Sequence, residues 1–182
     1  MNRLRFFLIL AITAGFVVPS SASNLDSSTK AKLSQNHTRM TRFSAFANSE
    51  LTRELQRAFA VSAKYQNVSQ AEADGYIPDV YEEGEGFHYF QPDYYDDGVF
   101  DIDHPETLLY VPDEHGKLRL AALEYLVPYD PDSPIPPAPD GFTGDDDVWR
   151  AGQEGFPEWA LNVWIWAYNP DGVFASKNPL VP

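Results

Sequence analysis

The sequence Thr-Leu-Leu-Tyr-Val-Pro-Asp-Glu-His-Gly-Lys-Leu-Arg-Leu-Ala-Ala-Leu-Glu-Tyr-Leu-Val, residues 107–127, is the stretch around which the rest of the chain can be placed. Two runs rich in Leu, Val and Tyr are separated by a short polar loop that ends at Gly116, a pattern typical of a β-hairpin. Glycine is favoured at the end of such a loop because it adopts positive φ at little cost. The sequence therefore predicts a hairpin here.

The second strand of this hairpin contains an unusual carboxylate. Period-two alternation predicts that Leu118, Leu120, Ala122, Glu124 and Leu126 share one face. Glu124 thus interrupts an aliphatic row, and a carboxylate in an apolar row is costly unless it is paired. This position is the sharpest functional clue in the sequence.

The N-terminus has the features of a secretory signal peptide. Arg3 and Arg5 precede an apolar run over residues 6–18, and small residues follow at 20–23. The apolar run is too short to span a bilayer. We predict that residues 1–23 are removed and that the mature protein is secreted or periplasmic.

The remaining chain is predicted to form a flexible lead-in over residues 24–43 and a single α+β domain over residues 44–182. The lead-in is polar and has few apolar residues. No later stretch is long and apolar enough for a transmembrane segment. The chain has no cysteine, so its core must hold the domain without disulfides.

The charge of the chain is strongly negative. The formal net charge is −14 at pH 7, and residues 79–182 contain 22 acidic side chains against 4 basic ones. Such a surface repels phosphate backbones, so a nucleic-acid partner is not expected.

Periodicity predicts an N-terminal helix packed on a mainly antiparallel sheet with long loops. Helical spacing covers residues 44–66, and a capping box at Ser69 predicts a short second helix. The predicted strands cover residues 87–91, 107–112, 117–127 and 159–168. Consecutive strands after a helical start favour the α+β class over a parallel sheet. The predicted loops cover residues 80–86, 93–106 and 128–155.

Three of the extended segments each place one hydrogen-bonding side chain among apolar neighbours: His88, Glu124 and Asn162. Because buried polar groups need partners, these side chains are expected to meet. Together they could hold a polar ligand, bind a divalent metal through His88 and Glu124, or satisfy one another as a structural cluster.

Aromatic residues near these positions suggest a pocket. Alternation places Trp164, Trp166 and Tyr168 on the face of Asn162, and Tyr125 follows Glu124. Aromatic side chains around a polar group suit a small apolar or sugar-like ligand, whereas an aromatic stripe can also be core. The predicted ligand-binding residues are His88, Glu124, Tyr125, Asn162 and Trp164.

No catalytic residue is assigned from the sequence. It contains no nucleophile elbow, phosphate-binding loop, HExxH zinc motif or dinucleotide fingerprint. The preferred function is non-enzymatic binding of a small molecule. The alternatives are a metal-dependent enzyme that uses His88 and Glu124, and a purely structural protein that interacts with the cell envelope. The oligomeric state is left open.

Several motifs resemble a family of exported microbial proteins of uncharacterised function. They are Gly-x-His-Tyr at 86–89, Gly-Lys-Leu-Arg-Leu at 116–120 with Glu-Tyr at 124–125, and Trp-x-Leu-x-Val-Trp-x-Trp at 159–166 with Asn-Pro at 169–170. The resemblance covers most of the mature chain and implies one compact domain without an established activity. Members of the family carry histidine at the position of Asn162 and another in the preceding loop. An amide oxygen replaces imidazole poorly on a transition metal, so the resemblance implies a weakened metal site here.

Overall fold

The predicted hairpin is present as strands β3 (Thr107–Pro112) and β4 (Leu118–Pro128) in the computed structural model, which describes residues 50–152 and 155–182. Gly116 has a φ of +76°, as the turn requires. The predicted signal peptide, the lead-in and the first residues of the predicted helix lie outside the described residues. The described residues all fall within one unit, Phe43–Pro182.

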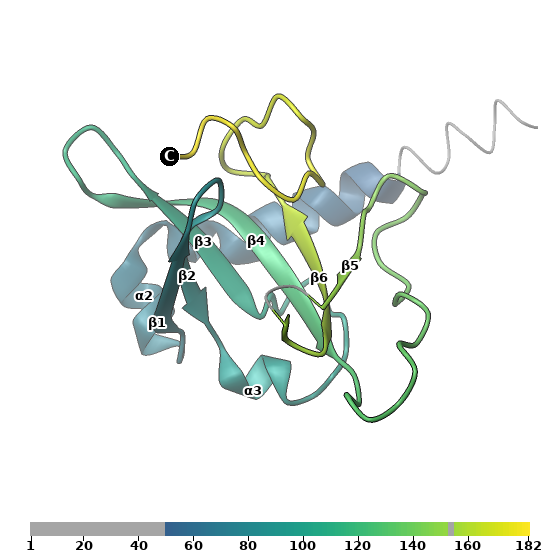
Figure 1. Ribbon diagram of the computed structural model, residues 1–182. Coiled ribbons are helices and arrows are strands. Elements are labelled where there is room, and N and C mark those ends of the chain that lie inside the picture. Colours follow the sequence, from purple (N-terminus) through teal and green to yellow (C-terminus); the bar gives the residue numbers. More distant parts are fainter. Residues whose placement is uncertain (1–49, 153–154) are drawn as a thin grey trace, which may run out of the picture. The chain divides into compact units, whose positions relative to one another are not determined.

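The hairpin lies inside a six-stranded sheet in which every neighbouring pair is antiparallel. The strand order is β1-β2-β3-β4-β6-β5 (Figure 1). The other strands are β1 (Ile77–Glu82), β2 (Gly86–Phe90), β5 (Arg150–Ala151) and β6 (Glu158–Val163). The α+β class predicted from the sequence is confirmed.

One face of the sheet packs against helices. The chain is helical over residues 50–62, continues as η2 (Ala63–Gln66), and then forms α2 (Val68–Ala73). The first of these helices runs behind the sheet in Figure 1 and contributes Ala58 to the core. The buried core on this face contains Ala58, Tyr65, Tyr76, Leu108, Tyr110, Leu120, Leu123, Tyr125, Leu161 and Val163. These side chains supply the apolar burial that stabilises the domain.

The other face of the sheet is covered in part by the end of the chain. Leu109 and Ala122 form a smaller apolar cluster there with Trp164 and Val181. The final residues also bind the turn between β1 and β2, where the Asn178 N–H donates to the carbonyl of Gly84 at 2.8 Å. The part of this face that the tail leaves uncovered contains the candidate site.

A bulge in β4 changes the predicted face assignment. Leu109 pairs with Ala122 but the next residue of β3, Tyr110, pairs with Leu120, so Ala121 is an extra residue. The expectation that Leu118 and Leu120 share a face with Glu124 is therefore wrong, because both pack in the helix-side core. Ala122 remains on the face of Glu124.

Four other element boundaries differ from the prediction. Strand β5 lies within the predicted loop 128–155, because residues 150 and 151 pair with β6. Residues 80–82 belong to strand β1 and not to a loop; this edge strand is mostly exposed and contains Pro78, so it has no alternating pattern. The short helix α3 (Pro92–Tyr95) begins just before the predicted loop 93–106. Helix α2 is capped by Asn67, whose side chain accepts from the N–H of Ser69, so the predicted capping box at Ser69 is not the cap.

The last strand is shorter than predicted. It ends at Val163, after which the N–H groups of Trp166 and Ala167 donate to the carbonyl of the bulge residue Ala121. Trp166 then stacks on Phe59 of the helix with ring centroids 3.9 Å apart, and Tyr168 is exposed. The predicted aromatic row beside Asn162 is therefore wrong. No helix within residues 50–152 and 155–182 is long and apolar enough to cross a membrane.

Replacement of Glu106 by Gln should reduce the pH dependence of stability. Burial raises the pKa of Glu106 from 4.5 to about 9, although the N–H of Leu126 donates to its Oε2 at 2.9 Å. The folded state keeps this proton while the unfolded state loses it above about pH 4.5, so stability falls as pH rises toward 9. Between pH 5 and 8 the free energy of unfolding of the wild-type protein should fall by about 2 to 4 kcal/mol. The Glu106→Gln variant should not show this loss.

Urea unfolding at both pH values measures this difference. The exposed Glu114, changed to Gln, is the matched control and should leave the pH dependence unchanged. An equal pH dependence for Glu106→Gln and wild type would contradict the buried, protonated state of Glu106.

Replacement of Gly86 by Ala should destabilise the fold more than the same change at Gly98. Both glycines have positive φ, +96° and +68°, so both substitutions strain the backbone. A Cβ at Gly86 would also overlap the carbonyl oxygen of Tyr110, whereas a Cβ at Gly98 meets nothing within 4 Å. We expect a loss of about 1 kcal/mol for Gly98→Ala and about 3 kcal/mol or more for Gly86→Ala in denaturant unfolding. Equal losses of stability in the two variants would show that the carbonyl of Tyr110 leaves room for a Cβ at Gly86.

Candidate functional site

The register of the central strands brings three of the predicted site residues to one face of the sheet. Glu124 on β4 pairs directly with Asn162 on β6 and with Thr107 on β3. His88 on β2 lies beyond Leu109 of β3. His88 Nε2 is 3.8 Å from Glu124 Oε2, so the two side chains meet across the intervening strand.

A fourth residue, Glu85, completes the cluster. Its Oε2 is 3.7 Å from His88 Nε2, and its side chain is only 2% exposed. Glu85 lies in the turn between β1 and β2, flanked by Gly84 and Gly86, both with positive φ. Strand alternation would place residues 85 and 88 on opposite faces, and the turn reverses this. For that reason the alternation pattern of the sequence does not indicate Glu85.

Asn162 holds Glu85 in place. Its Nδ2 donates to Glu85 Oε2 at 2.9 Å and to the carbonyl of Ser176 at 2.7 Å. Its Oδ1 accepts from Arg150 at 3.1 Å. Asn162 therefore fixes one carboxylate of the cluster instead of facing the pocket itself.

The two carboxyl groups of the cluster have opposite pKa shifts. Burial raises the pKa of Glu124 to about 8, with His88 opposing the shift. Burial also acts on Glu85, but contacts with His88 and Asn162 outweigh it and hold its pKa below the ordinary value. Burial lowers the pKa of His88, yet Glu85 and then Glu124 raise it to about 9. At pH 7 the cluster thus holds an ionised Glu85, a protonated His88 and a largely neutral Glu124.

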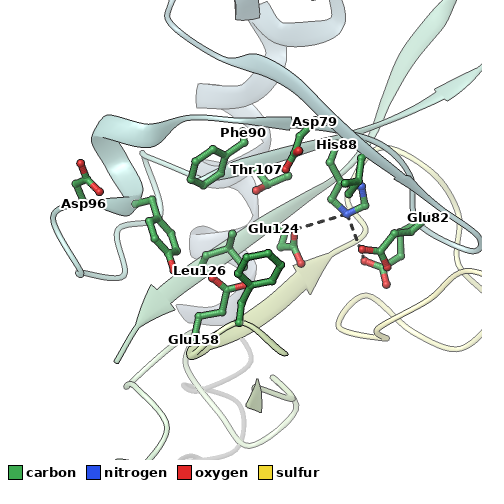
Figure 2. Close-up of a pocket in the computed structure, with 13 residues that line it drawn as sticks. Asp79, Glu82, His88, Phe90, Asp96, Thr107, Glu124, Leu126 and Glu158 are labelled. Carbon is green, nitrogen blue, oxygen red and sulfur yellow. Dashed lines mark ion pairs between the residues drawn. The ribbon is translucent and has the colours of Figure 1, made fainter. Parts of the chain in front are cut away.

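The cluster forms one end of a pocket of about 330 Å³. In Figure 2, His88 and Glu124 lie beside Glu82, and Phe90, Leu126 and Glu158 lie toward the other end. Six carboxyl side chains and one imidazole line the pocket together with Thr107: Asp79, Glu82, Glu85, His88, Asp96, Glu124 and Glu158. The remaining lining residues are Val80, Phe90, Tyr95, Leu126 and Phe156. The pocket is therefore acidic with an apolar wall.

Glu158 and Tyr95 both line this pocket. Burial raises the pKa of the Glu158 carboxyl group, and the Tyr95 hydroxyl partly offsets that effect. The sequence offered a signal for Glu158, because alternation along β6 places it on the face of Asn162. Phe156 lies before the strand and left no periodic signal.

Two predicted ligand-binding residues lie elsewhere. Tyr125 is next to Glu124 on β4 and so points to the opposite face, where its hydroxyl donates to the carbonyl of Ile102 at 3.0 Å. Trp164 lies beyond the end of β6, and its Nε1 donates to the carbonyl of Ala175 at 2.7 Å. Neither residue lines the pocket.

The cluster could hold a cation. Glu85, His88 and Glu124 each offer one ligand atom, and these atoms all lie within 4.8 Å of one another. All three residues are buried. Two carboxylates and an imidazole are common protein ligands of divalent metals.

The chain was compared with models of known protein families, with curated proteins and with solved structures, and none of these comparisons found a match.

Proposed function

We propose that this protein is a non-enzymatic binding module for a small organic ligand that carries a positive charge on an apolar body. The observation that carries the proposal is the pocket of about 330 Å³, in which six carboxyl side chains border an apolar wall. Pockets for small ligands are typically about 300 to 1,000 Å³ and combine apolar surface with a few polar groups.

The charge of the pocket favours a cation. One imidazole faces six carboxyl groups, and even a protonated His88 leaves an excess of negative charge. A cationic ligand would be attracted to these carboxylates, whereas an anion would be repelled. The rings of Phe90, Tyr95 and Phe156 can also contact a cation through their faces.

The lining supports binding better than covalent catalysis. Among the described residues that line the pocket there is no serine, cysteine or lysine, which are three of the side chains that act as nucleophiles in covalent catalysis. The histidine is paired with two carboxyl groups at 3.7 and 3.8 Å. A structural polar cluster alone would need no adjoining cavity, because its groups would satisfy one another.

Benzylammonium should bind more tightly than its uncharged and anionic counterparts. We expect at least tenfold tighter binding than benzyl alcohol or benzoate in isothermal titration calorimetry with EDTA present. The ring would contact the apolar wall and the ammonium group the carboxylates. Added salt should weaken binding, because it screens these charges. Equal affinity for the three compounds, or binding of none, would overturn the proposal.

Two substitutions test whether this binding occurs in the pocket. Glu158→Gln removes one lining carboxylate and Phe156→Ala removes part of the apolar wall, so each should weaken benzylammonium binding at least fivefold. Glu114→Gln and Ile135→Ala change exposed residues outside the pocket and serve as matched controls. Binding that survives both pocket variants would place the compound elsewhere.

We also propose that the protein acts outside the cytoplasm. Arg3, Arg5 and the apolar run over residues 6–18 support this, together with the absence of cysteine.

The mature protein from its source organism should therefore lack residues 1–23 and begin at Asn24. Intact-mass measurement of the secreted or periplasmic fraction checks this. Recovery of the full-length chain from the cytoplasm alone would contradict export.

A further inference from the structure

Two buried side chains in the pocket, Glu85 and His88, have buried polar atoms without hydrogen-bond partners among the described residues. Within the described part of the chain, neither Glu85 Oε1 nor His88 Nδ1 has a hydrogen-bond partner. The hydrogen bonds among the described residues also include none to the Glu124 carboxyl group, whose side chain is 8% exposed. Buried polar atoms are normally paired, so this concentration calls for an explanation.

The side chains of Glu85, His88 and Glu124 face one another but form no hydrogen bonds with one another. The separations of 3.7 Å from His88 Nε2 to Glu85 and 3.8 Å to Glu124 exceed hydrogen-bond length. Lys177 Nζ lies 3.9 Å from Glu85 Oε1, which is also too long for a hydrogen bond. In Figure 2 a dashed line joins His88 to Glu124.

These separations suit an ion between the groups. Oxygen and nitrogen ligands lie about 2.0 to 2.2 Å from zinc, so two ligands of a tetrahedral ion are about 3.4 Å apart. The ligand atoms of Glu85, His88 and Glu124 lie within 4.8 Å of one another. Small side-chain rotations would therefore bring the three ligand atoms to the spacing of a zinc site without moving the strands.

Hydrogen bonds from neighbouring residues orient Glu85. Asn162 donates to Glu85 Oε2 and is itself held by Ser176 and Arg150. Hydrogen bonds of this kind orient metal-binding side chains and commonly contribute 10- to 100-fold to affinity. The site is thus supported by β6 and by the C-terminal segment.

We propose that Glu85, His88 and Glu124 form a binding site for a divalent first-row transition ion, with Zn²⁺ as the best-fitting example. The imidazole favours such an ion over Mg²⁺ or Ca²⁺. Binding of the ion releases the protons of His88 and Glu124, and the two carboxylates then balance its charge. The pocket lies on the open side of the three ligands, so further coordination positions face the cavity. This inference concerns the inorganic ion and does not rest on the organic ligand proposed above.

Titration of untagged, EDTA-treated and desalted protein with Zn²⁺ alone tests the site. Isothermal titration calorimetry should give one equivalent bound, and Glu85→Gln and Glu124→Gln should each lower the affinity at least tenfold. Gln preserves the shape of each side chain while it removes the charge. His115→Gln is the matched control, because His115 forms an exposed pair with Glu114 at 3.4 Å that could also attract zinc.

A measurement on the wild-type protein covers the case in which the variants fail to fold. In NMR spectra, Zn²⁺ should shift the ring signals of His88 and leave those of the exposed His104 and His115 unchanged. The inference is overturned if wild type binds no stoichiometric zinc, if binding survives both carboxylate variants, or if the shifts occur only at the exposed histidines. Zinc binding without benzylammonium binding would contradict the proposed function and support the metal site. Benzylammonium binding without zinc binding would support the proposed function and contradict the metal site.

Discussion

The pairing of β4 on both of its edges is the constraint on which the rest of the structure depends. Its backbone is hydrogen-bonded to β3 on one side and β6 on the other, so its pleat is fixed. Successive side chains must then point to opposite faces. Leu123 and Tyr125 enter the helix-side core while Glu124, between them, enters the acidic pocket. A single residue therefore separates the apolar core from the polar site.

Burial has different consequences for the two carboxyl groups beside His88. Glu85 receives a hydrogen bond from Asn162 and keeps its charge, whereas no described residue donates one to Glu124, and the pKa of Glu124 rises. The difference comes from donors supplied by distant segments, since Asn162 is in turn positioned by Arg150 and Ser176. A carboxylate in a low-dielectric interior is stable only where such donors are present. The cluster thus combines one fixed charge with one adjustable carboxyl group next to the cavity.

The fold was predictable where local pattern and burial agree. The hairpin around Gly116 has a strong turn signal, and the helix over residues 50–62 has helical apolar spacing. The pattern failed where tertiary contacts override it. Edge strand β1 is too exposed to show alternation, and the bulge at Ala121 reverses the faces of β4. The chain also leaves the sheet after Val163, although its aromatic residues continue the pattern of a strand.

By itself, the sequence determined that His88, Glu124 and Asn162 are polar residues in apolar strands, because alternation and composition are local properties. Only the tertiary structure decided which of them meet a cavity. It added Glu85, because two positive-φ glycines turn its side chain toward the sheet. It removed Trp164 from the pocket, because the chain leaves the sheet after Val163 and the Trp164 indole donates to the carbonyl of Ala175. Strand order and turn geometry bring distant residues together, and neither is encoded in the spacing of residues along one segment.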